Sequence, residues 1–291
     1  MAANSKIEWC DHTFNPVVGC TKLSAACDNC YAESWAKRTG QSGLWSGERR
    51  RTSATNWRQP IRWNRLAEES NTRPKVFCAS LADVFDNQWD TLWRSDLWTL
   101  IGLTPHLDWL LLTKRPQNIA KMLPSTWGAG WPNVWFGTTV ENQEEADRRI
   151  PHLLSVPARL HFLSCEPLLG HVHLPPQDAY WQPIDWVICG GESGPNARPM
   201  HPNWGRSLRD QCVAVGVPFF MKQWGEYHPA DQVQNAEQIK IAGDVATPLQ
   251  DGRAVDLGDQ WTWKIGKKAA GALLDGREWR QFPARGETDA P

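Results

Sequence analysis

The stretch GCTKLSAACDNCYAE, residues 19–33, gathers three cysteines within eleven positions: Cys20, Cys27 and Cys30. Thiolates at such short spacings are typical ligands of zinc or of an iron–sulfur cluster. Structural zinc usually takes four Cys or His ligands, and here Cys10 or His12 would have to supply the fourth. Three thiolates on an iron–sulfur cluster instead leave one iron open for a non-protein ligand. The spacing alone leaves both alternatives open.

Short apolar runs that end in polar clusters recur along the chain and predict the strands that position this loop. They are NPVVGC, KVFCASLADVF, DWLLLTKRP, VWFGTTVEN, RLHFLSCEPLLG, DWVICGGESG and VPFFMKQWG. The runs do not alternate between apolar and polar residues, which favours strands buried on both faces of a parallel sheet. The first run leads directly into Cys20, so residues 20–30 are expected to form the first strand-to-helix loop.

Helical patterns separate the predicted strands. Examples are 29–38, 90–100, 143–154 and 203–215, and Asn142 with Glu145 fits an N-cap and its capping partner for the third. Strands that alternate with helices predict an α/β fold, here a complete or partial (β/α) TIM-type barrel, with an open flavodoxin-like sheet as the alternative. We expect a barrel domain over residues 1–228 and a carboxyl-terminal extension over 229–291 that packs on the barrel and contains a short helix. The Pro-rich stretch 174–183 is expected to be an excursion between two units of the barrel.

Polar side chains that follow the strands are expected to meet at one end of the barrel, where such folds place their sites. They are Ser80, Asp83, Lys114, Arg115, Glu141, Asn142, Glu166, Glu192, Ser193, Lys222 and Gln223. Among them, Glu166 and Lys114 are the candidate catalytic residues, as an acid–base group and an anion-binding group. Each of these charges could equally pair with a neighbouring side chain.

Composition narrows the class of protein. The 291 residues carry a net charge of −1, which argues against a surface that binds polyanions generally. The sequence shows neither a signal-peptide pattern nor an apolar run long enough to span a membrane, so a cytoplasmic protein without membrane contact is expected. In that compartment disulfides are rare, and Cys78, Cys165, Cys189 and Cys212 are interpreted as buried core residues. Most of the 19 tryptophans are likewise interpreted as core residues.

Six motifs in order, GC…C…CYAE, TKRP, TVEN, FLSCEPLLG, GGESGP.ARPM and KQWG, resemble a phage-borne, radical-SAM-like family of formerly unknown function. The resemblance runs from about Ile7 to Phe282. It implies that Cys20, Cys27 and Cys30 ligate a 4Fe-4S cluster whose open iron binds S-adenosylmethionine. It also implies cofactor contacts from Gly190, Gly191, Glu192, Ser193 and Tyr31. The cysteine spacing departs from the CxxxCxxC of most radical-SAM enzymes, and GGE follows the sixth predicted strand rather than the second, so Glu192 could serve the substrate instead.

The resemblance further implies a radical-SAM enzyme of phage DNA hypermodification in the host cytoplasm, for example an isomerase of amino-acid-substituted thymine. Its partners would be phage DNA or a modified nucleotide and a host flavodoxin- or ferredoxin-type reductant. Two segments that interleave Arg with Trp, 49–65 and 198–206, could line a groove for a DNA strand. The alternatives are a radical-SAM enzyme of repair or peptide modification, and a zinc-stabilised nucleic-acid-binding module without catalysis.

Overall fold

The computed structural model describes residues 5–176, 183–232 and 254–284, which fall into two compact units. The first unit comprises Met1–Thr139 and Asp147–Phe162, and the second Val140–Ala146, Leu163–Asp178 and Pro183–Pro291. Most of the predicted excursion at 174–183 lies outside the described residues. Within the described ranges, no helix has the length and apolar character needed to cross a membrane.

A seven-stranded sheet organises the chain. Its order is β1-β4-β5-β6-β7-β8-β9, with bounds His12–Phe14, Lys75–Cys78, Asp108–Thr113, Val134–Thr139, Leu160–Cys165, Trp186–Gly190 and Phe219–Gln223. Strand β1 pairs in parallel with β4, β4 with β5, β5 with β6, and β8 with β9. The mixed α/β prediction is therefore confirmed, and the strand order is compatible with a partial (β/α) barrel. A complete TIM-type barrel stays a prediction, because a closed one has eight parallel strands.

Six of the seven predicted runs contain a strand of this sheet, but the first prediction was wrong. The strand that joins the sheet is β1, ahead of the run NPVVGC, and its Phe14 pairs with Cys78. Within the run, Val17–Val18 (β2) pairs antiparallel with Arg50–Arg51 (β3) in a separate two-stranded sheet. The chain leaves the main sheet at Asn15, whose side chain bonds to Ser80 and to the backbone of Leu81.

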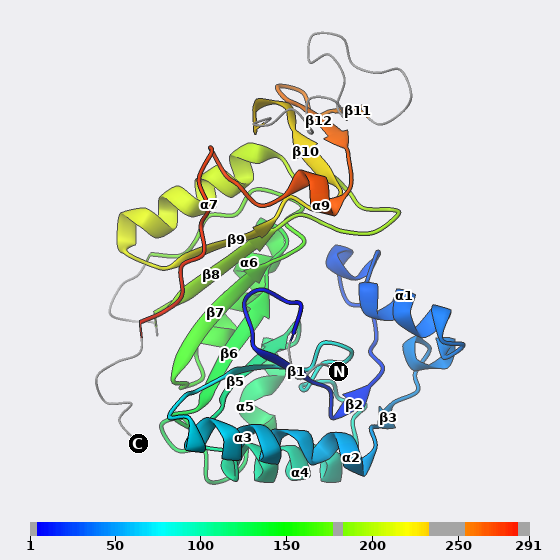
Figure 1. Cartoon of the computed structure of the whole chain (residues 1–291), viewed down its shortest axis with the longest axis vertical. Coiled ribbons are helices and arrows are strands. Elements are labelled where there is room, and N and C mark those ends of the chain that lie inside the picture. Colours follow the sequence, from blue (N-terminus) through cyan, green and yellow to red (C-terminus); the bar gives the residue numbers. More distant parts are fainter. Residues whose placement is uncertain (1–4, 177–182, 233–253, 285–291) are drawn as a thin grey trace. The chain divides into compact units, whose positions relative to one another are not determined.

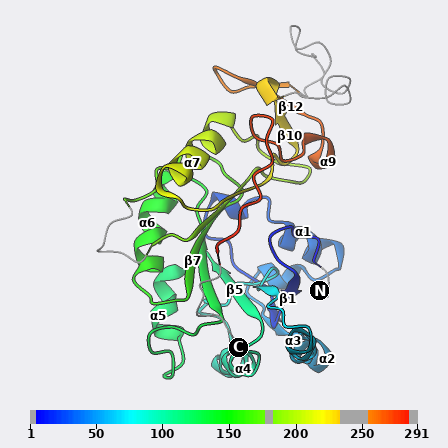
Figure 2. The ribbon, with the colours of Figure 1, turned by 60° about the vertical axis from the view of Figure 1, so that its left-hand side comes forward.

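Helices flank the strands of the first unit. They are α1 Tyr31–Arg38, α2 Ala54–Trp57, α3 Gln59–Glu69, α4 Thr91–Gly102 and α5 Ile119–Met122, joined by short 3-10 turns at Ala25–Cys27, Ser42–Trp45 and Pro116–Asn118. Figure 1 shows α2 and α3 end to end, with α4 beside α3. Figure 2 shows α5 on one side of this unit's strands and α1 on the other. The segment that carries the cysteines thus lies on the α1 side.

Local capping explains where the predicted helices begin. The backbone N–H of Glu145 donates to the side-chain oxygen of Asn142 at 3.0 Å, which confirms the predicted N-cap of α6, Gln143–Leu154. Asp90 caps α4 in the same way through the N–H of Leu92. Because each cap satisfies a backbone donor that the helix leaves unpaired, these residues fix the starts of the helices.

In the second unit, helix α7, Pro202–Val215, packs along β8 and β9 (Figure 1). Three antiparallel strands, β10 Tyr227–Pro229, β12 Trp261–Lys264 and β11 Ala254–Asp256, form a small sheet, and the predicted short helix is confirmed as α9, Lys267–Ala270. Near the carboxyl end, the N–H of Met221 in β9 donates to the carbonyl of Trp279, and the N–H of Gln281 donates to that of Phe219. The carboxyl-terminal segment therefore bonds to β9.

The cores of both units are built from apolar and aromatic side chains. The largest fully buried ones include Trp9, Trp109, Trp186, Trp224 and Trp263, as the interpretation of tryptophan as a core residue predicted. Cys78, Cys165, Cys189 and Cys212 are also buried, as expected. Burial raises the pKa of the Cys212 thiol to about 12 and raises those of the other three. These thiols are therefore protonated and unreactive at neutral pH.

Candidate functional site

All three clustered cysteines lie on one segment of the first unit, between β2 and α1. Cys20 follows β2, Cys27 ends the 3-10 turn, and Cys30 immediately precedes the first residue of α1. Their thiols are free of disulfides, with Cys27 buried and the other two partly exposed. Tyr31, the predicted cofactor contact, donates its hydroxyl to the carbonyl of Ser80 at 2.7 Å and so ties the start of α1 to the end of β4.

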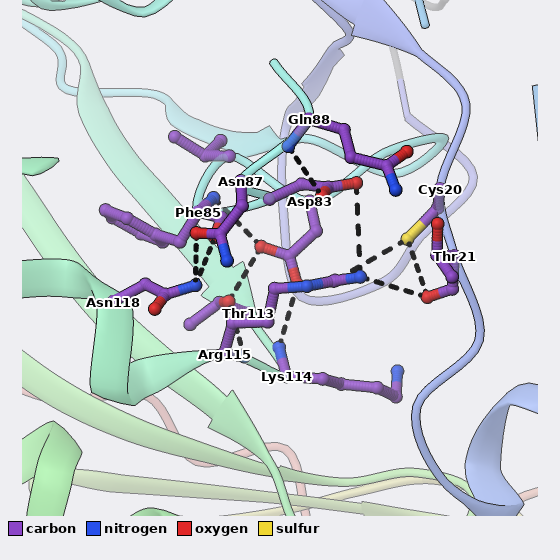
Figure 3. A network of polar contacts seen from close by, with 12 residues as sticks. Cys20, Thr21, Asp83, Phe85, Asn87, Gln88, Thr113, Lys114, Arg115 and Asn118 are labelled. Atoms are coloured by element: carbon purple, nitrogen blue, oxygen red, sulfur yellow. Dashed lines mark hydrogen bonds and ion pairs between the residues drawn. The ribbon is translucent and has the colours of Figure 1, made fainter. Parts of the chain in front are cut away.

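A buried network of charges lies beneath this segment (Figure 3). Arg115, which follows β5, donates to Asp83 at 3.0 Å, and Asp83 also accepts from the Thr113 hydroxyl and from the backbone of Phe85 and Lys114. Both charged side chains are less than a tenth exposed. Because each polar atom of Asp83 has a partner, the burial of its charge is compensated.

A second buried ion pair extends the network. Arg49 donates to Asp86 at 2.6 and 2.8 Å and to the hydroxyl of Thr21 at 2.7 Å. The guanidinium of Arg115 lies 3.9 Å from the same Asp86 carboxylate. The two pairs therefore form one cluster of two acids and two bases. The sequence predicted Asp83 and Arg115 as site residues but not Arg49 and Asp86. An arginine within a basic run is usually interpreted as a solvated side chain, so Arg49 was missed.

The network reaches one of the cysteines directly. The guanidinium of Arg115 approaches the sulfur of Cys20 at 3.8 Å and donates to the carbonyl of Thr21 at 3.0 Å (Figure 3). Burial raises the pKa of the Cys20 thiol to about 11, and the charge of Asp83 adds to the rise while that of Arg115 opposes it. Without a bound metal, Cys20 is therefore a thiol at neutral pH, and coordination would have to displace its proton.

The two metal alternatives make different demands on the donor set. Among the described residues, no three His, Cys, Asp or Glu side chains are grouped so as to hold a metal ion. The proposed fourth zinc ligands are engaged elsewhere, since the ring of His12 stacks on Trp63 at 4.3 Å and the Cys10 thiol bonds to Ser5 and Ile7. A cluster places its thiolates on different irons, so it does not need three sulfurs around one point. The three free thiols lie on one segment with the cation of Arg115 at Cys20, and their binding of an iron–sulfur cluster stays a prediction.

Lys114, one of the two candidate catalytic residues, joins the network through its backbone only. Its N–H donates to Asp83 at 3.1 Å, while its ammonium group has no hydrogen bond or ion pair within the described part of the chain. Figure 3 shows its side chain extending away from Asp83, on the side of the Cys20–Thr21 segment. An unpaired ammonium group is available to an anionic ligand, whereas Arg115 is already committed to Asp83.

The second unit brings together the other candidate residues, at the carboxyl ends of β7, β8 and β9. The carboxylate of Glu166 lies 2.7 and 2.9 Å from the ammonium of Lys222 and accepts from the amide of Gln223 at 3.0 Å. The side chains of Glu166 and Lys222 are each about one-sixth exposed, at 17% and 16%. Glu166 is thus held in place by an ion pair.

Glu192 is paired more completely. It is 6% exposed, and Arg198 donates to it from its backbone and from two guanidinium nitrogens at 2.7–2.9 Å. Its neighbour Ser193 lies at the surface of the following turn, where the N–H of Gly194 donates to Glu226. The bidentate pair of Arg198 and Glu192 fixes the turn after β8. Contact of Glu192 or Ser193 with S-adenosylmethionine stays a prediction.

The two glycines of GGE have different neighbours. A Cβ at Gly191 would lie 1.9 Å from the carbonyl oxygen of Trp224, and one at Gly225 would lie 2.1 Å from that of Glu192. The atoms nearest to a Cβ at Gly190 would belong to the side chain of Glu166, from 3.3 Å. The absence of a side chain at Gly191 therefore allows the neighbouring chain segment to approach its backbone closely.

The predicted site residues thus form two groups, one in each unit. The group of the first unit contains the cysteines, Tyr31 and Lys114, and the group of the second unit contains Glu166 and the GGES turn. Each group combines buried ion pairs with residues at the ends of parallel strands, where α/β proteins place their sites.

Comparison with known proteins gives one informative result. Neither the curated proteins nor the solved structures contain a significant match to the chain. A family model described as a protein of unknown function, DUF5131, matches residues 4–283. Because the match covers nearly the whole sequence, the chain belongs to the DUF5131 family.

Proposed function

We propose that the protein is a radical-SAM enzyme whose Cys20, Cys27 and Cys30 hold a 4Fe-4S cluster. The observation that carries the proposal is the placement of three free thiols on one segment beside parallel strands, with Arg115 at the first of them. When bound, such a cluster supplies an electron to S-adenosylmethionine and so permits C–H activation.

The surrounding residues suit an anionic cluster. Arg115 is fixed by Asp83, so its charge stays beside the sulfur of Cys20. Hydrogen bonds and charges near the sulfurs tune the reduction potential of a cluster. Lys114 provides a second cation, free to bind a carboxylate such as that of S-adenosylmethionine.

In the second unit, Glu166 and Lys222 are the groups able to exchange a proton with a substrate. They form an ion pair that remains partly open to solvent, so a polar substrate could replace either partner. We propose a substrate of the DNA-hypermodification class, for example an amino-acid-substituted thymine that is isomerised. Such a base would have to leave the duplex, or be a free nucleotide, to reach a site in a folded domain.

The first experiment is anaerobic reconstitution with iron and sulfide, followed by iron and sulfide analysis and electron paramagnetic resonance after reduction. One four-iron cluster per chain is expected. Replacing any one of Cys20, Cys27 and Cys30 with Ala should abolish the cluster, while Cys78→Ala, at a buried cysteine of β4, should retain it.

The outcome that contradicts the proposal is stoichiometric zinc binding without iron uptake under reducing, anaerobic conditions. The substrate is tested separately, by the stimulation of 5′-deoxyadenosine formation. If modified DNA and modified nucleotide fail to stimulate it while a peptide does, the substrate assignment is wrong although the cluster stands.

A further inference from the structure

We propose that the exposed face of α3, together with the residue that joins it to α2, binds the phosphate backbone of DNA through Arg58, Arg62 and Arg65. Residues 50–66 contain five arginines and no acidic residue, although the whole chain has 31 basic and 32 acidic side chains. Figure 1 shows these two helices end to end in the first unit. A positive surface of this kind is what a nearly neutral protein needs for local contact with a polyanion.

Ion pairs within the fold use the arginines that precede the helices. Arg51 pairs with Asp96 at 2.5 Å, and its guanidinium lies 4.0 Å above the ring of Trp57. Arg50 donates to the side chain of Gln41. These two arginines are therefore engaged in the fold.

The three arginines of the helices differ from these two. They are exposed, and their spacing of four and then three residues places them on one helical face. The backbone N–H of Arg62 donates to the carbonyl of Arg58 at 3.3 Å, so the helical turn continues across the junction of α2 and α3. Arg58 bonds to the carbonyl of Ala54, Arg65 forms a loose, exposed pair with Glu69 at 3.6 Å, and the guanidinium of Arg62 has no partner in the described ranges.

The order of charges along α3 is unfavourable for the helix itself. Its first turn holds no acidic residue and its last turn no basic one, while Glu68 and Glu69 lie at its carboxyl end. A helix is stabilised by the opposite order, because its amino-terminal end carries partial positive charge. Arg58 and Arg62, at the amino-terminal end of α3, therefore add to the positive potential of the helix dipole, an arrangement that favours the binding of an anion and not the stability of α3.

Both tryptophans of this segment have contacts within the fold, with Trp63 buried and Trp57 half-buried beneath the guanidinium of Arg51, so this inference does not use the stacking of bases. Trp63 is 5% exposed and stacks on His12. Trp57 contacts the edge of Phe14 and donates to the carbonyl of Pro16 at 3.2 Å. The contact with DNA is therefore one of phosphates alone and independent of base sequence.

The length of the face matches its partner. Seven residues of helix between Arg58 and Arg65 span about 10 Å, which is the axial length of about three phosphates of one DNA strand. The inference rests on the proposed function in one respect, the choice of DNA as the polyanion. It does not require a bound iron–sulfur cluster.

The test measures binding of the purified full chain, without reconstitution, to a short fluorescent DNA duplex over a range of salt concentrations. The variant Arg58→Gln/Arg62→Gln/Arg65→Gln keeps good helix formers in α2 and α3. Its plot of log K against log salt should be flatter by about 2.7, at roughly 0.9 for each lost phosphate contact. The control Arg38→Gln/Lys267→Gln/Lys268→Gln removes the same charge from exposed positions elsewhere and should keep the wild-type slope.

Unchanged binding in the triple variant would overturn the inference, as would an equal loss in the control. Wild-type protein that binds polyglutamate but not DNA would also overturn it, in favour of an acidic polypeptide partner. Circular dichroism checks that both variants are folded. Iron uptake is measured on separate samples, so a failure of the cluster proposal does not affect this result.

Discussion

The carboxylate of Asp83 accepts a hydrogen bond from Arg115 at 3.0 Å, and the same guanidinium nitrogen lies 3.8 Å from the sulfur of Cys20. One buried ion pair therefore links the end of β4, the end of β5 and the cysteine segment. Its acid is 4% exposed and its base 6%. The position of Cys20 depends on this pair, which leads to the first prediction.

Asp83→Ala should destabilise the protein strongly, because it removes the carboxylate closest to the buried charge of Arg115 and leaves only Asp86, at 3.9 Å. Breaking a buried pair in this way costs about 3–5 kcal/mol. Urea unfolding at neutral pH measures the loss. The control is Asp96→Ala, which breaks the exposed pair with Arg51 and should cost at most about 1 kcal/mol. Equal losses in the two variants would show that the Asp83 pair is not buried in solution.

A second prediction compares adjacent glycines. Gly191→Ala should be markedly destabilising, since the new methyl group would overlap the carbonyl of Trp224 and force two backbone segments apart. Overpacking of this kind costs about 1–3 kcal/mol or more. At Gly190→Ala the nearest atoms belong to the side chain of Glu166, at 3.3 Å, so this variant should cost less. Thermal unfolding of the two variants decides the matter, and a larger effect at Gly190 would contradict the observed packing.

Much of the fold could be predicted from sequence because its strands are short apolar runs that are buried on both faces. Such a run can be located in the sequence without knowing which strand it pairs with. The first strand could not be predicted in this way. The run NPVVGC is as apolar as the others, and only the pairing of Val17–Val18 with Arg50–Arg51 shows that it belongs to a different sheet. Long-range pairing is invisible in a local pattern.

For the candidate site, the residues could be predicted from sequence but their contacts could not. The cysteines stand out by spacing, and the charged residues stand out because they follow strands. What each charge contacts depends on residues far along the chain. Glu192 is paired with Arg198, whereas the ammonium of Lys114 has no partner among the residues that the structure describes, and nothing in their own motifs distinguishes these two cases.

The third prediction concerns the pair of Glu166 and Lys222. A double-mutant cycle with Glu166→Gln and Lys222→Met should give a coupling energy of about 1–2 kcal/mol, between the values typical of exposed and buried pairs. Arg65 and Glu69, an exposed pair at 3.6 Å, provide the matched control and should couple by less than about 0.5 kcal/mol. A coupling near zero for the first pair would mean that the two side chains are apart in solution.

The last prediction is a pH dependence in the second unit. Burial would raise the pKa of Asp275, but hydrogen bonds from Arg206, Arg209 and Gln232 outweigh it and hold that pKa well below its ordinary value. A carboxyl group whose pKa is lower in the folded state stabilises the fold above its unfolded pKa, near 4, and loses this contribution as the pH falls toward the folded value.

Asp275→Asn should therefore lower the unfolding temperature at pH 7 and have progressively less effect as the pH is lowered from about 4 toward 2. The measurement is thermal unfolding of wild type and variant across that range. Asp210→Asn is the control, because its carboxylate is exposed and, among the described residues, pairs with Arg209 alone, and it should change the unfolding temperature little at any pH. A difference between wild type and Asp275→Asn that stays constant from pH 7 to pH 2 would show that the loss comes from packing. In that case the ion pairs of Asp275 with Arg206 and Arg209 of α7 would not contribute to the stability of the fold.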